Sequence, residues 1–338
     1  MMDRYVSLDE YNTFGLHVTA SYYSKITDAG EIFDLIKESV LTEEKHLILG
    51  GGSNVLFLDD FYNGLVIHIN SKGKILLRET VNDVYIRVAA GESWSDFVVE
   101  MVNQGYGGLE NLSMIPGTVG AAPIQNIGAY GTELKDVFYQ LTAIDLSNGE
   151  KVLFNRAECE FGYRTSVFKT RLKDRFIITH VDFKLKKHPV INVNYGALHQ
   201  HLYEKGIANP TVNDVSNSVI SIRKSKLPDP AQLGNAGSFF KNPVVHNLLF
   251  QDLQREFPDI VGYNDMKGFK KVSAAWLIEK TQWKGKRIGN AGFHDKQALI
   301  LVNYGNATGR ELFQVAMQAK QAVIENFGIE LEMEVNIA

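Results

Sequence analysis

The chain has 338 residues, enough for two or three domains, and its 45% hydrophobic and 22% charged residues are ordinary for a globular enzyme. The formal net charge of -4 gives no electrostatic reason to expect nucleic acid or an anionic membrane as a partner. Cys159 is the single cysteine, which excludes an intramolecular disulfide, offers no metal site and fits a reducing cytoplasm. We expect neither a signal peptide nor a membrane span, because no apolar run approaches the ~20 residues that a membrane helix needs.

The first predicted elements are short strands interrupted by a glycine-rich loop. Leu47–Leu49 indicates a buried strand, Gly50–Asn54 forms the loop, and the apolar run resumes over 55–58. Ser93 can accept a backbone N–H as the cap of a helix over 94–104. Further strands are predicted at 65–69, 84–90 and 176–185.

Residues 105–131 are so rich in glycine and proline that they exclude a long regular element. They indicate instead a loop that passes close to a ligand. After this loop, Leu141–Leu146 and Lys151–Phe154 flank Asn148-Gly149, and this arrangement predicts a β-hairpin.

The second half of the chain has a different character. Helices are predicted at 213–226, 274–281 and 310–326, and Pro228 stops the first of them. The segment 331–337 alternates strictly between apolar and polar residues, which predicts a strand with one buried face. Because strands and helices mix without a regular βαβ rhythm, the fold class is expected to be α+β.

The common nucleotide-binding motifs are absent. Val55 occupies the last glycine position of a GxGxxG pattern, and neither Gly73-Lys74 nor Gly285-Lys286 is followed by the Ser or Thr of a P-loop. Gly50–Asn54 could still bind a phosphate through successive backbone N–H groups, although the loop taken alone is more typical of a tight turn between two strands. A second polar, glycine-rich loop at 113–131 favours the binding of a dinucleotide.

Short motifs that run nearly from end to end resemble those of the UDP-N-acetylenolpyruvoylglucosamine reductases, flavoenzymes of peptidoglycan synthesis. Each motif alone is weak, but their order and spacing together are specific. They are NTFG at 12–15, LILGGGSNVL at 47–56, the stretch 108–131, GYRTS at 162–166, KLPDP at 226–230, GNAGSFFKNP at 234–243, AAWLIE at 274–279, the stretch 295–301 and LEMEV at 331–335.

The resemblance implies a vanillyl-alcohol-oxidase-type FAD-binding fold of two α+β subdomains with a third, substrate-binding α+β domain. Residues 1–72 would form the first subdomain, to which a C-terminal strand at 328–338 returns. Residues 73–227 would form the second subdomain, and 228–327 the domain for the UDP-sugar. Because Gly50–Asn54 contains no histidine, the FAD is expected to be non-covalent.

The implied activity is the NADPH-dependent reduction of UDP-N-acetylglucosamine enolpyruvate to UDP-N-acetylmuramate by a cytoplasmic monomer that binds no nucleic acid. Arg164 in GYRTS matches the residue that holds the developing enolate, since a guanidinium presents a planar fork of donors to a carboxylate. Ser238 matches the proton donor, and Glu334 matches a glutamate near the substrate carboxylate. Without the resemblance, Arg164 would be interpreted as a surface arginine and Ser238 as a turn serine. Glu334 would be interpreted as a residue on the solvated face of a strand.

Further residues are expected to bind ligands. The cofactor positions are Gly50, Gly51, Gly52, Ser53, Asn54, Ile115, Pro116, Gly117, Gly120, Ala121, Gln125, Asn126, Gly128 and Arg164. The substrate positions are Tyr195, Lys226, Asn242, Tyr263 and Gln297, with Lys241 less certain. Two alternatives remain open: a flavin-dependent alcohol or sugar oxidase of the same fold, and a non-catalytic binder of UDP-sugar or flavin.

Overall fold

The computed structural model describes residues 2–38, 41 and 45–338, and the chain forms two compact units. The first unit consists of Met1–Val6, Ala20–Gly52 and Asn63–Ser225, and the second of Ser7–Thr19, Ser53–Tyr62 and Lys226–Ala338. Strands and helices mix in both units, as expected of an α+β fold. Across the residues that the structure describes, no helix combines the length and apolar character needed to cross a bilayer.

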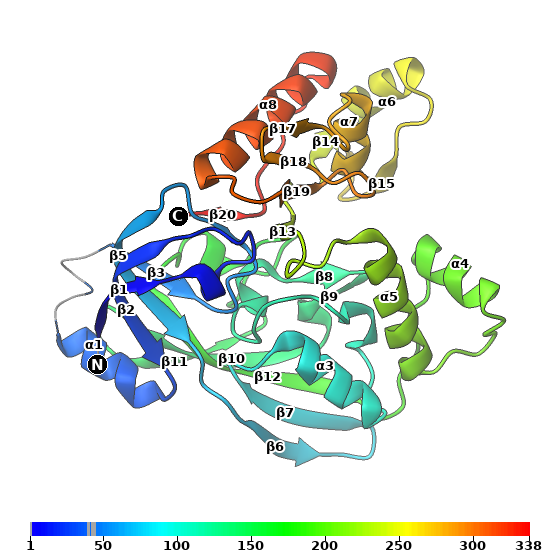
Figure 1. The fold of residues 1–338 in the computed structure, drawn as a ribbon. Helices are drawn as coiled ribbons and strands as arrows, with labels where there is room; N and C mark the ends of the chain where they lie inside the picture. The colour runs from blue at the N-terminus through cyan, green and yellow to red at the C-terminus, as the bar shows by residue number, and fades with distance from the viewer. Residues whose placement is uncertain (1, 39–40, 42–44) are drawn as a thin grey trace. The chain divides into compact units, whose positions relative to one another are not determined.

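The first unit contains a four-stranded sheet close to the N-terminus (Figure 1). Its strands run in the order β1-β2-β5-β3, and β3 pairs with β5 in parallel. The bounds are Asp3–Ser7 for β1, Thr19–Ile26 for β2, His46–Leu49 for β3 and Phe61–Ile69 for β5. The strands predicted at 47–49 and 65–69 are therefore confirmed. The helix α1, Ala29–Lys37, follows β2 and begins with a capping box formed by Asp28 and Glu31.

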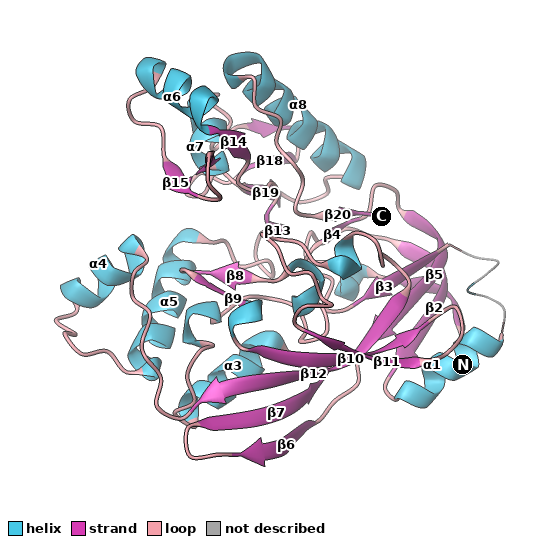
Figure 2. Ribbon diagram, turned by 180° about the vertical axis from the view of Figure 1, so that it is seen from behind, coloured by secondary structure: helices cyan, strands magenta, loops and turns pink. Residues whose placement is uncertain are grey.

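A five-stranded antiparallel sheet forms the rest of the framework of this unit. The strand order is β11-β10-β12-β7-β6, and Figure 2 shows β6 at its outer edge. The bounds are Lys74–Glu79 for β6, Asp83–Ala89 for β7, Phe138–Asp145 for β10, Lys151–Asn155 for β11 and Phe176–Lys186 for β12. The strands predicted at 84–90 and 176–185 and the hairpin are confirmed, and the central strands β7, β10 and β12 are buried along most of their length.

The helix α3, Trp94–Asn103, packs against this sheet. Its N-terminus is capped as predicted, because the hydroxyl of Ser93 accepts the backbone N–H of Asp96 at 3.3 Å. The ring centroids of Trp94 and Phe97 lie 5.9 Å and 4.8 Å from that of Phe183 on β12. These buried aromatic rings join the helix to the sheet in one hydrophobic core.

Residues 105–131 form an irregular loop, as their glycine content predicts. Its short elements are η2 (Glu110–Leu112), η3 (Ala122–Gln125) and β8 (Gly128–Ala129), and β8 pairs with β9 (Thr132–Glu133) before η4 (Leu134–Asp136). After η5 (Val167–Lys169) and β12, the unit ends with the helices α4 (Gly196–Glu204) and α5 (Val212–Lys226). The predicted helix 213–226 is thus confirmed, and α4 packs against it through a small separate cluster of leucine and valine side chains.

The second unit contains two further sheets. One has the order β13-β19-β18-β17 and the other the order β14-β16-β15, all with antiparallel pairs. The strand bounds are Gly234–Ser238 (β13), Val244–His246 (β14), Gly262–Asn264 (β15), Phe269–Val272 (β16), Arg287–Ile288 (β17), Ala291–Phe293 (β18) and Ile300–Asn303 (β19). The helices are α6 (Asn247–Glu256), α7 (Ala274–Lys280) and α8 (Gly309–Phe327), so the helices predicted at 274–281 and 310–326 are confirmed.

The predicted C-terminal strand is wrong in its extent. Only Asn336–Ile337 forms a strand, β20, and it pairs in parallel with β4, Val55–Leu56. Met333 makes a single bridge to Phe240, so the preceding chain is extended without belonging to a continuous ladder. The strict alternation still has a physical cause, because Leu331 and Val335 are both buried.

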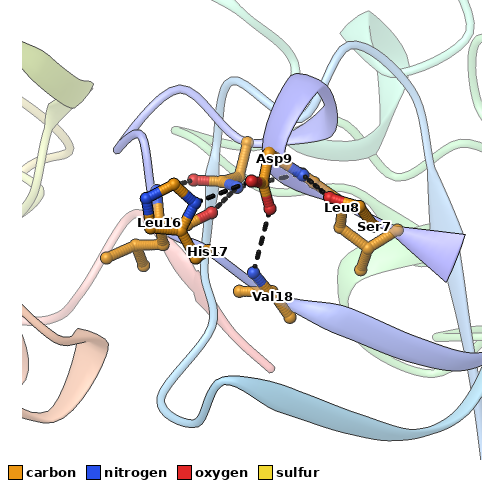
Figure 3. Close-up of polar contacts among 7 residues, drawn as sticks. Ser7, Leu8, Asp9, Leu16, His17 and Val18 are labelled. Carbon is orange, nitrogen blue, oxygen red and sulfur yellow. Dashed lines mark hydrogen bonds and ion pairs between the residues drawn. The ribbon is translucent and has the colours of Figure 1, made fainter. Parts of the chain in front are cut away.

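A polar network shapes the N-terminal segment of the second unit (Figure 3). Asp9 accepts hydrogen bonds from the Nδ1 of His17 at 2.7 Å and from the backbone N–H of Val18 at 3.2 Å. The buried amide of Asn12 donates to the carbonyls of Leu8 and Leu16 and accepts the N–H of Leu16, all within 3.0 Å. These bonds close the loop that carries the NTFG motif.

The predicted domain boundaries can be compared with the two units. The boundaries predicted at 1–72, 73–227 and 228–327 stay predictions; the four-stranded sheet lies within residues 3–69 and the five-stranded sheet within residues 74–186. The segments Ser7–Thr19 and Ser53–Tyr62, however, pack with the C-terminal part of the chain, which begins at Lys226. The pairing of β4 with β20 is the physical reason why Ser53–Tyr62 packs with the C-terminal part of the chain.

Candidate functional site

The two glycine-rich loops pack against each other within the first unit. A Cβ atom on Gly50 would lie 2.5 Å from the Oγ1 of Thr118, and one on Gly51 would lie 3.2 Å from the Cα of Gly117. Glycine fits this position without displacing Thr118, whereas a side chain would move the Thr118 hydroxyl or one of the loops. Such a meeting of backbones, with few side chains between them, is a suitable cradle for the phosphates of a dinucleotide.

Most of the predicted cofactor positions are accessible in the structure. Exposed or partly exposed are Gly50, Gly51, Ser53, Asn54, Ile115, Pro116, Gly117, Gly120, Ala121, Gln125, Gly128 and Arg164, while Gly52 and Asn126 are buried. Thr118 is also partly exposed beside Gly50, and the sequence analysis did not select it. Its place between glycines in the second loop was the signal available.

The side chain of Asn126 forms hydrogen bonds with three other residues, Glu133, Lys135 and Gly162. Its side-chain amide donates to the carboxylate of Glu133 at 3.1 Å and to the carbonyl of Gly162 at 3.0 Å, and it accepts the N–H of Lys135 at 3.0 Å. The residue itself adopts φ 44°, a left-handed conformation that asparagine tolerates better than most residues. The structure thus commits the side chain of Asn126 to protein partners.

Arg164 lies at the tip of the turn that Asn126 holds. Gly162 and Thr165 close this turn through backbone hydrogen bonds of 3.1 Å and 3.4 Å. Arg164 adopts φ 54°, and its Nη2 donates to the carbonyl of Gly128. A Cβ on Gly128 would lie 2.8 Å from Nη1 of Arg164, so glycine is what permits this approach. A strained arginine held in this way points to a function for its guanidinium.

Tyr130 and Tyr195 form an aromatic pair in the first unit. Their ring centroids lie 5.2 Å apart at an interplanar angle of 75°. The backbone of Tyr130 adopts φ 48°, and its carbonyl accepts the side-chain amide of Asn111 at 2.9 Å. Tyr195 precedes α4 as its N-cap and is 43% exposed, which leaves part of this predicted substrate residue accessible.

Ser238 ends β13 in the second unit, and its side chain is exposed. The ladder between β13 and β19 shifts register between Asn235 and Ser238, and Gly237 within this bulge has φ 71°. A bulge of this kind redirects the side chain that follows it. The strand is anchored behind the bulge, because the N–H of Asn235 donates to the carbonyl of Thr13 at 2.8 Å.

The structure brings the main chains of Ser238 and Glu334 close together. The N–H of Glu334 donates to the carbonyl of Phe239, the residue after Ser238, at 2.8 Å. The amide of Asn54 donates to the carbonyl of Glu334 at 3.2 Å, so the end of the first glycine-rich loop supports the same segment. The side chain of Glu332, in contrast, is 73% exposed and forms an ion pair with Lys241. Lys241 therefore has a structural partner.

The remaining predicted substrate residues also belong to the second unit. Asn242 accepts the N–H of Ala274 at the start of α7 at 2.9 Å, which leaves its amide NH₂ as the group for a ligand. Tyr263 on β15 is 48% exposed, Gln297 lies in the loop before β19, and Lys226 ends α5 with an exposed side chain. Of the three predicted catalytic residues, Ser238 and Glu334 are neighbours in this unit, and Arg164 belongs to the first.

Comparison with known proteins identifies two family models and many relatives. Residues 229–338 match the UDP-N-acetylenolpyruvoylglucosamine reductase C-terminal domain, and residues 20–154 match an FAD binding domain. The UDP-N-acetylenolpyruvoylglucosamine reductase of Flavobacterium johnsoniae is 48% identical over 332 residues, covering 98% of both chains. The reductase of the same name from Pseudomonas putida is 46% identical, covering 98% of this chain and 97% of its own.

A solved structure supports the fold independently of close sequence similarity. The UDP-N-acetylenolpyruvylglucosamine reductase of Thermus caldophilus aligns with 100% of this chain and 98% of its own, with a TM-score of 0.67 and 24% identity. Together with the FAD binding domain, this likeness establishes the vanillyl-alcohol-oxidase-type fold expected from the motifs. Neither the oxidase nor the non-catalytic binder is favoured by these relatives.

Proposed function

The chain belongs to the UDP-N-acetylenolpyruvoylglucosamine reductase family, and we propose that Arg164, Ser238 and Glu334 are the residues that act on its substrate. It is an FAD-dependent oxidoreductase that uses NADPH to reduce UDP-N-acetylglucosamine enolpyruvate to UDP-N-acetylmuramate, a step of peptidoglycan synthesis. The observation that best supports the assignment is the hydrogen bond that joins the segment of Glu334 to the residue after Ser238.

The packing of the two glycine-rich loops suits an FAD. A Cβ on Gly50 would lie 2.5 Å from the Oγ1 of Thr118, so the loops meet mainly through backbone atoms. Backbone N–H groups are suited to binding phosphates. We propose that Gly50, Gly51, Gly117 and Gly120 hold the pyrophosphate. The bound flavin supplies the carrier through which a hydride passes from NADPH to the substrate double bond.

Arg164 and Glu334 would act on the carboxylate of the enolpyruvyl group. Addition of a hydride to the terminal carbon leaves negative charge on the adjacent carbon and its carboxylate. The planar guanidinium of Arg164 offers paired donors to that carboxylate, and its fixed turn means that it is oriented before the charge develops. Glu334 would share a proton with the same group, which requires its carboxyl to be protonated beside the anion.

Ser238 would give a proton to the carbon next to the carboxylate. A serine hydroxyl is a weak acid, so the step depends on accurate placement and on a charged neighbour. The bulge at Gly237 and the buried rings of Phe239 and Phe240 determine where this hydroxyl lies. The side-chain amide of Asn242 and the ammonium group of Lys226 would bind the UDP phosphates, with Tyr195, Tyr263 and Gln297 at the nucleotide.

Stopped-flow absorbance of the flavin in the Ser238→Ala holoenzyme tests this assignment. Reduction by NADPH should stay within about twofold of the unmodified rate, while reoxidation by the enolpyruvyl substrate should slow by about 10²- to 10⁴-fold. Ser21→Ala is the matched control, since Ser21 lies on β2, where its hydroxyl donates to Asn63 on the neighbouring strand β5 at 3.2 Å. Reoxidation of Ser238→Ala at the unmodified rate would show that another group is the acid.

We also propose that the enzyme acts as a monomer in the cytoplasm. The edge strand β6 exposes Ile75, Leu76 and Leu77, yet its ladder with β7 shifts register after Leu76. Bulges of this kind prevent an edge strand from pairing with another chain. Lys74 and Glu79 lie at the two ends of this strand. They form ion pairs with Glu100 and Lys187 of the same chain.

A further inference from the structure

The guanidinium of Arg223 has one buried donor, its Nε, that no hydrogen bond satisfies. Arg223 follows Ile222 on α5, and the apolar side chains of this helix pack against α4 and against the ring of Tyr130. The Nε of Arg223 is shielded from solvent and has no hydrogen-bond partner among the residues described. Native proteins rarely leave a buried donor unpaired, and a charged donor least of all, so this atom calls for an explanation.

The groups around Arg223 do not neutralise its charge. Burial lowers the pKa of Arg223, Tyr130 raises it, and the nearby Arg164 lowers it again. Burial also raises the pKa of Tyr130, so that the phenol is neutral at physiological pH. Among the residues that the structure describes, no carboxylate contributes to the shift in the pKa of Arg223. A guanidinium placed in this way, in the field of a second guanidinium, is stabilised when an anion binds.

The position of Arg223 indicates which anion it receives. Its neighbour is Arg164, to which the proposed function assigns the substrate carboxylate. Lys226, assigned to the phosphates, lies three residues further along α5, a spacing that places two side chains on the same side of a helix. Arg223 is therefore an electrostatic neighbour of the cation assigned to the carboxylate, and it lies on the same helix as the cation assigned to the phosphates.

We propose that Arg223 is a further substrate-binding residue, whose guanidinium binds the carboxylate of the enolpyruvyl group together with Arg164. This inference rests on the proposed function. Tyr130 would act as a positioning residue, because its ring lies between Tyr195 and the apolar cluster of α5 and its backbone is fixed by Asn111. Two arginines on one carboxylate would also stabilise the additional charge of the enolate, so Arg223 should affect the rate as well as binding.

The affinities of two ligands for the FAD-loaded enzyme test the proposal. UDP-N-acetylmuramate has the carboxylate and UDP-N-acetylglucosamine lacks it, while both have the UDP group. Arg223→Met removes the charge and retains a long apolar side chain. We expect this variant to bind UDP-N-acetylmuramate about 10- to 100-fold more weakly, with the affinity for UDP-N-acetylglucosamine within about twofold of the unmodified value. Isothermal titration calorimetry measures both affinities.

Two further variants make the result specific. Lys224→Met removes a charge from the adjacent, exposed position of α5 and should leave both affinities unchanged. Arg223→Lys keeps the charge without the fork of donors and should recover part of the lost affinity for UDP-N-acetylmuramate. A larger fall in kcat than in substrate affinity for Arg223→Met would support the role in the enolate.

The outcomes separate this inference from the proposed function. An equal loss for both ligands would assign Arg223 to the UDP group or to folding, and an unchanged affinity for both would remove it from the site. Either result overturns the inference while the reductase assignment stands. If the unmodified enzyme neither prefers UDP-N-acetylmuramate to UDP-N-acetylglucosamine nor reduces the enolpyruvyl compound, the proposed function itself fails.

Discussion

Substitution of Gly50 by alanine tests whether the packing of the two glycine-rich loops holds the cofactor. The new Cβ would lie 2.5 Å from the Oγ1 of Thr118, whereas ordinary van der Waals contact begins near 3.4 Å. The hydroxyl of Thr118, or the loop that carries it, must therefore move by about 0.9 Å, the difference between these distances. Overpacking of this kind costs about 1–3 kcal/mol, which corresponds to a loss in FAD affinity of about 5- to 150-fold.

A double-mutant cycle isolates this contact. Removal of the Thr118 hydroxyl leaves the nearest neighbours of the new Cβ at 3.5 Å and 3.6 Å, the Cβ atoms of Ala121 and of residue 118. Gly50→Ala combined with Thr118→Ala should thus bind FAD with close to the affinity of Thr118→Ala alone. Gly196→Ala is the control, because its Cβ would meet no atom within 4 Å.

The assay is a titration of the apoprotein with FAD, followed by quenching of flavin fluorescence. Urea denaturation of each apoprotein shows whether the strain weakens the fold instead of the site. The reasoning is refuted if Gly50→Ala binds FAD as tightly as the unmodified chain with the same free energy of unfolding. It is also refuted if Thr118→Ala fails to restore the affinity that Gly50→Ala loses.

Two predictions concern stability and assembly. Arg175 and Ser147 hold the pKa of Asp145 at about 2, below its ordinary 3.8, so the pair stabilises the fold above about pH 4 and stops doing so as the pH falls towards 2. Because the side chain of Arg175 is 51% exposed, we expect a contribution of about 1–2 kcal/mol, which Asp145→Asn should remove, flattening the dependence of urea stability on pH in that range. Sedimentation equilibrium at micromolar concentration should give the mass of one chain, and a stable dimer would contradict the interpretation of the bulged β6 edge.

The local elements followed from the sequence because their causes are local. The apolar run at 84–90 predicted β7, alternation over 176–185 predicted β12, Asn148-Gly149 predicted the hairpin, and Ser93 predicted the start of α3. Each signal acts over a few residues, where side-chain periodicity and capping decide the backbone. The family also followed from the sequence, because ordered motifs along the chain survive changes elsewhere.

The same local rules misjudged the C-terminal segment. Strict alternation over 331–337 predicted one strand, yet only Asn336–Ile337 pairs continuously. A strand requires a partner as well as a pattern, and Met333 finds only an isolated bridge to Phe240. The alternation therefore reported which side chains are buried, whereas the available neighbours decided the hydrogen bonding.

The identities of the candidate site residues came from the motifs, but their support came from residues far away in the chain. NTFG served in the sequence only as a family motif, and in the structure the carbonyl of Thr13 accepts the N–H of Asn235 while the carbonyl of Phe14 accepts the side-chain amide of Asn303. Asn126, expected at the cofactor, also holds the turn of Arg164 through a hydrogen bond to the carbonyl of Gly162. The buried Nε of Arg223 could not be recognised in a helix of polar appearance.

The sequence by itself determined the elements, the family and the chemical groups available to the reaction. Only the tertiary structure decided that Glu332 pairs with Lys241 while Glu334 is joined to the segment of Ser238, and that Gly237 lies in a bulge. The physical reason is that backbone preference depends on neighbours within one or two turns, whereas partnership and burial depend on which distant segments pack together. A pattern specifies that a side chain is polar, and packing specifies what it meets.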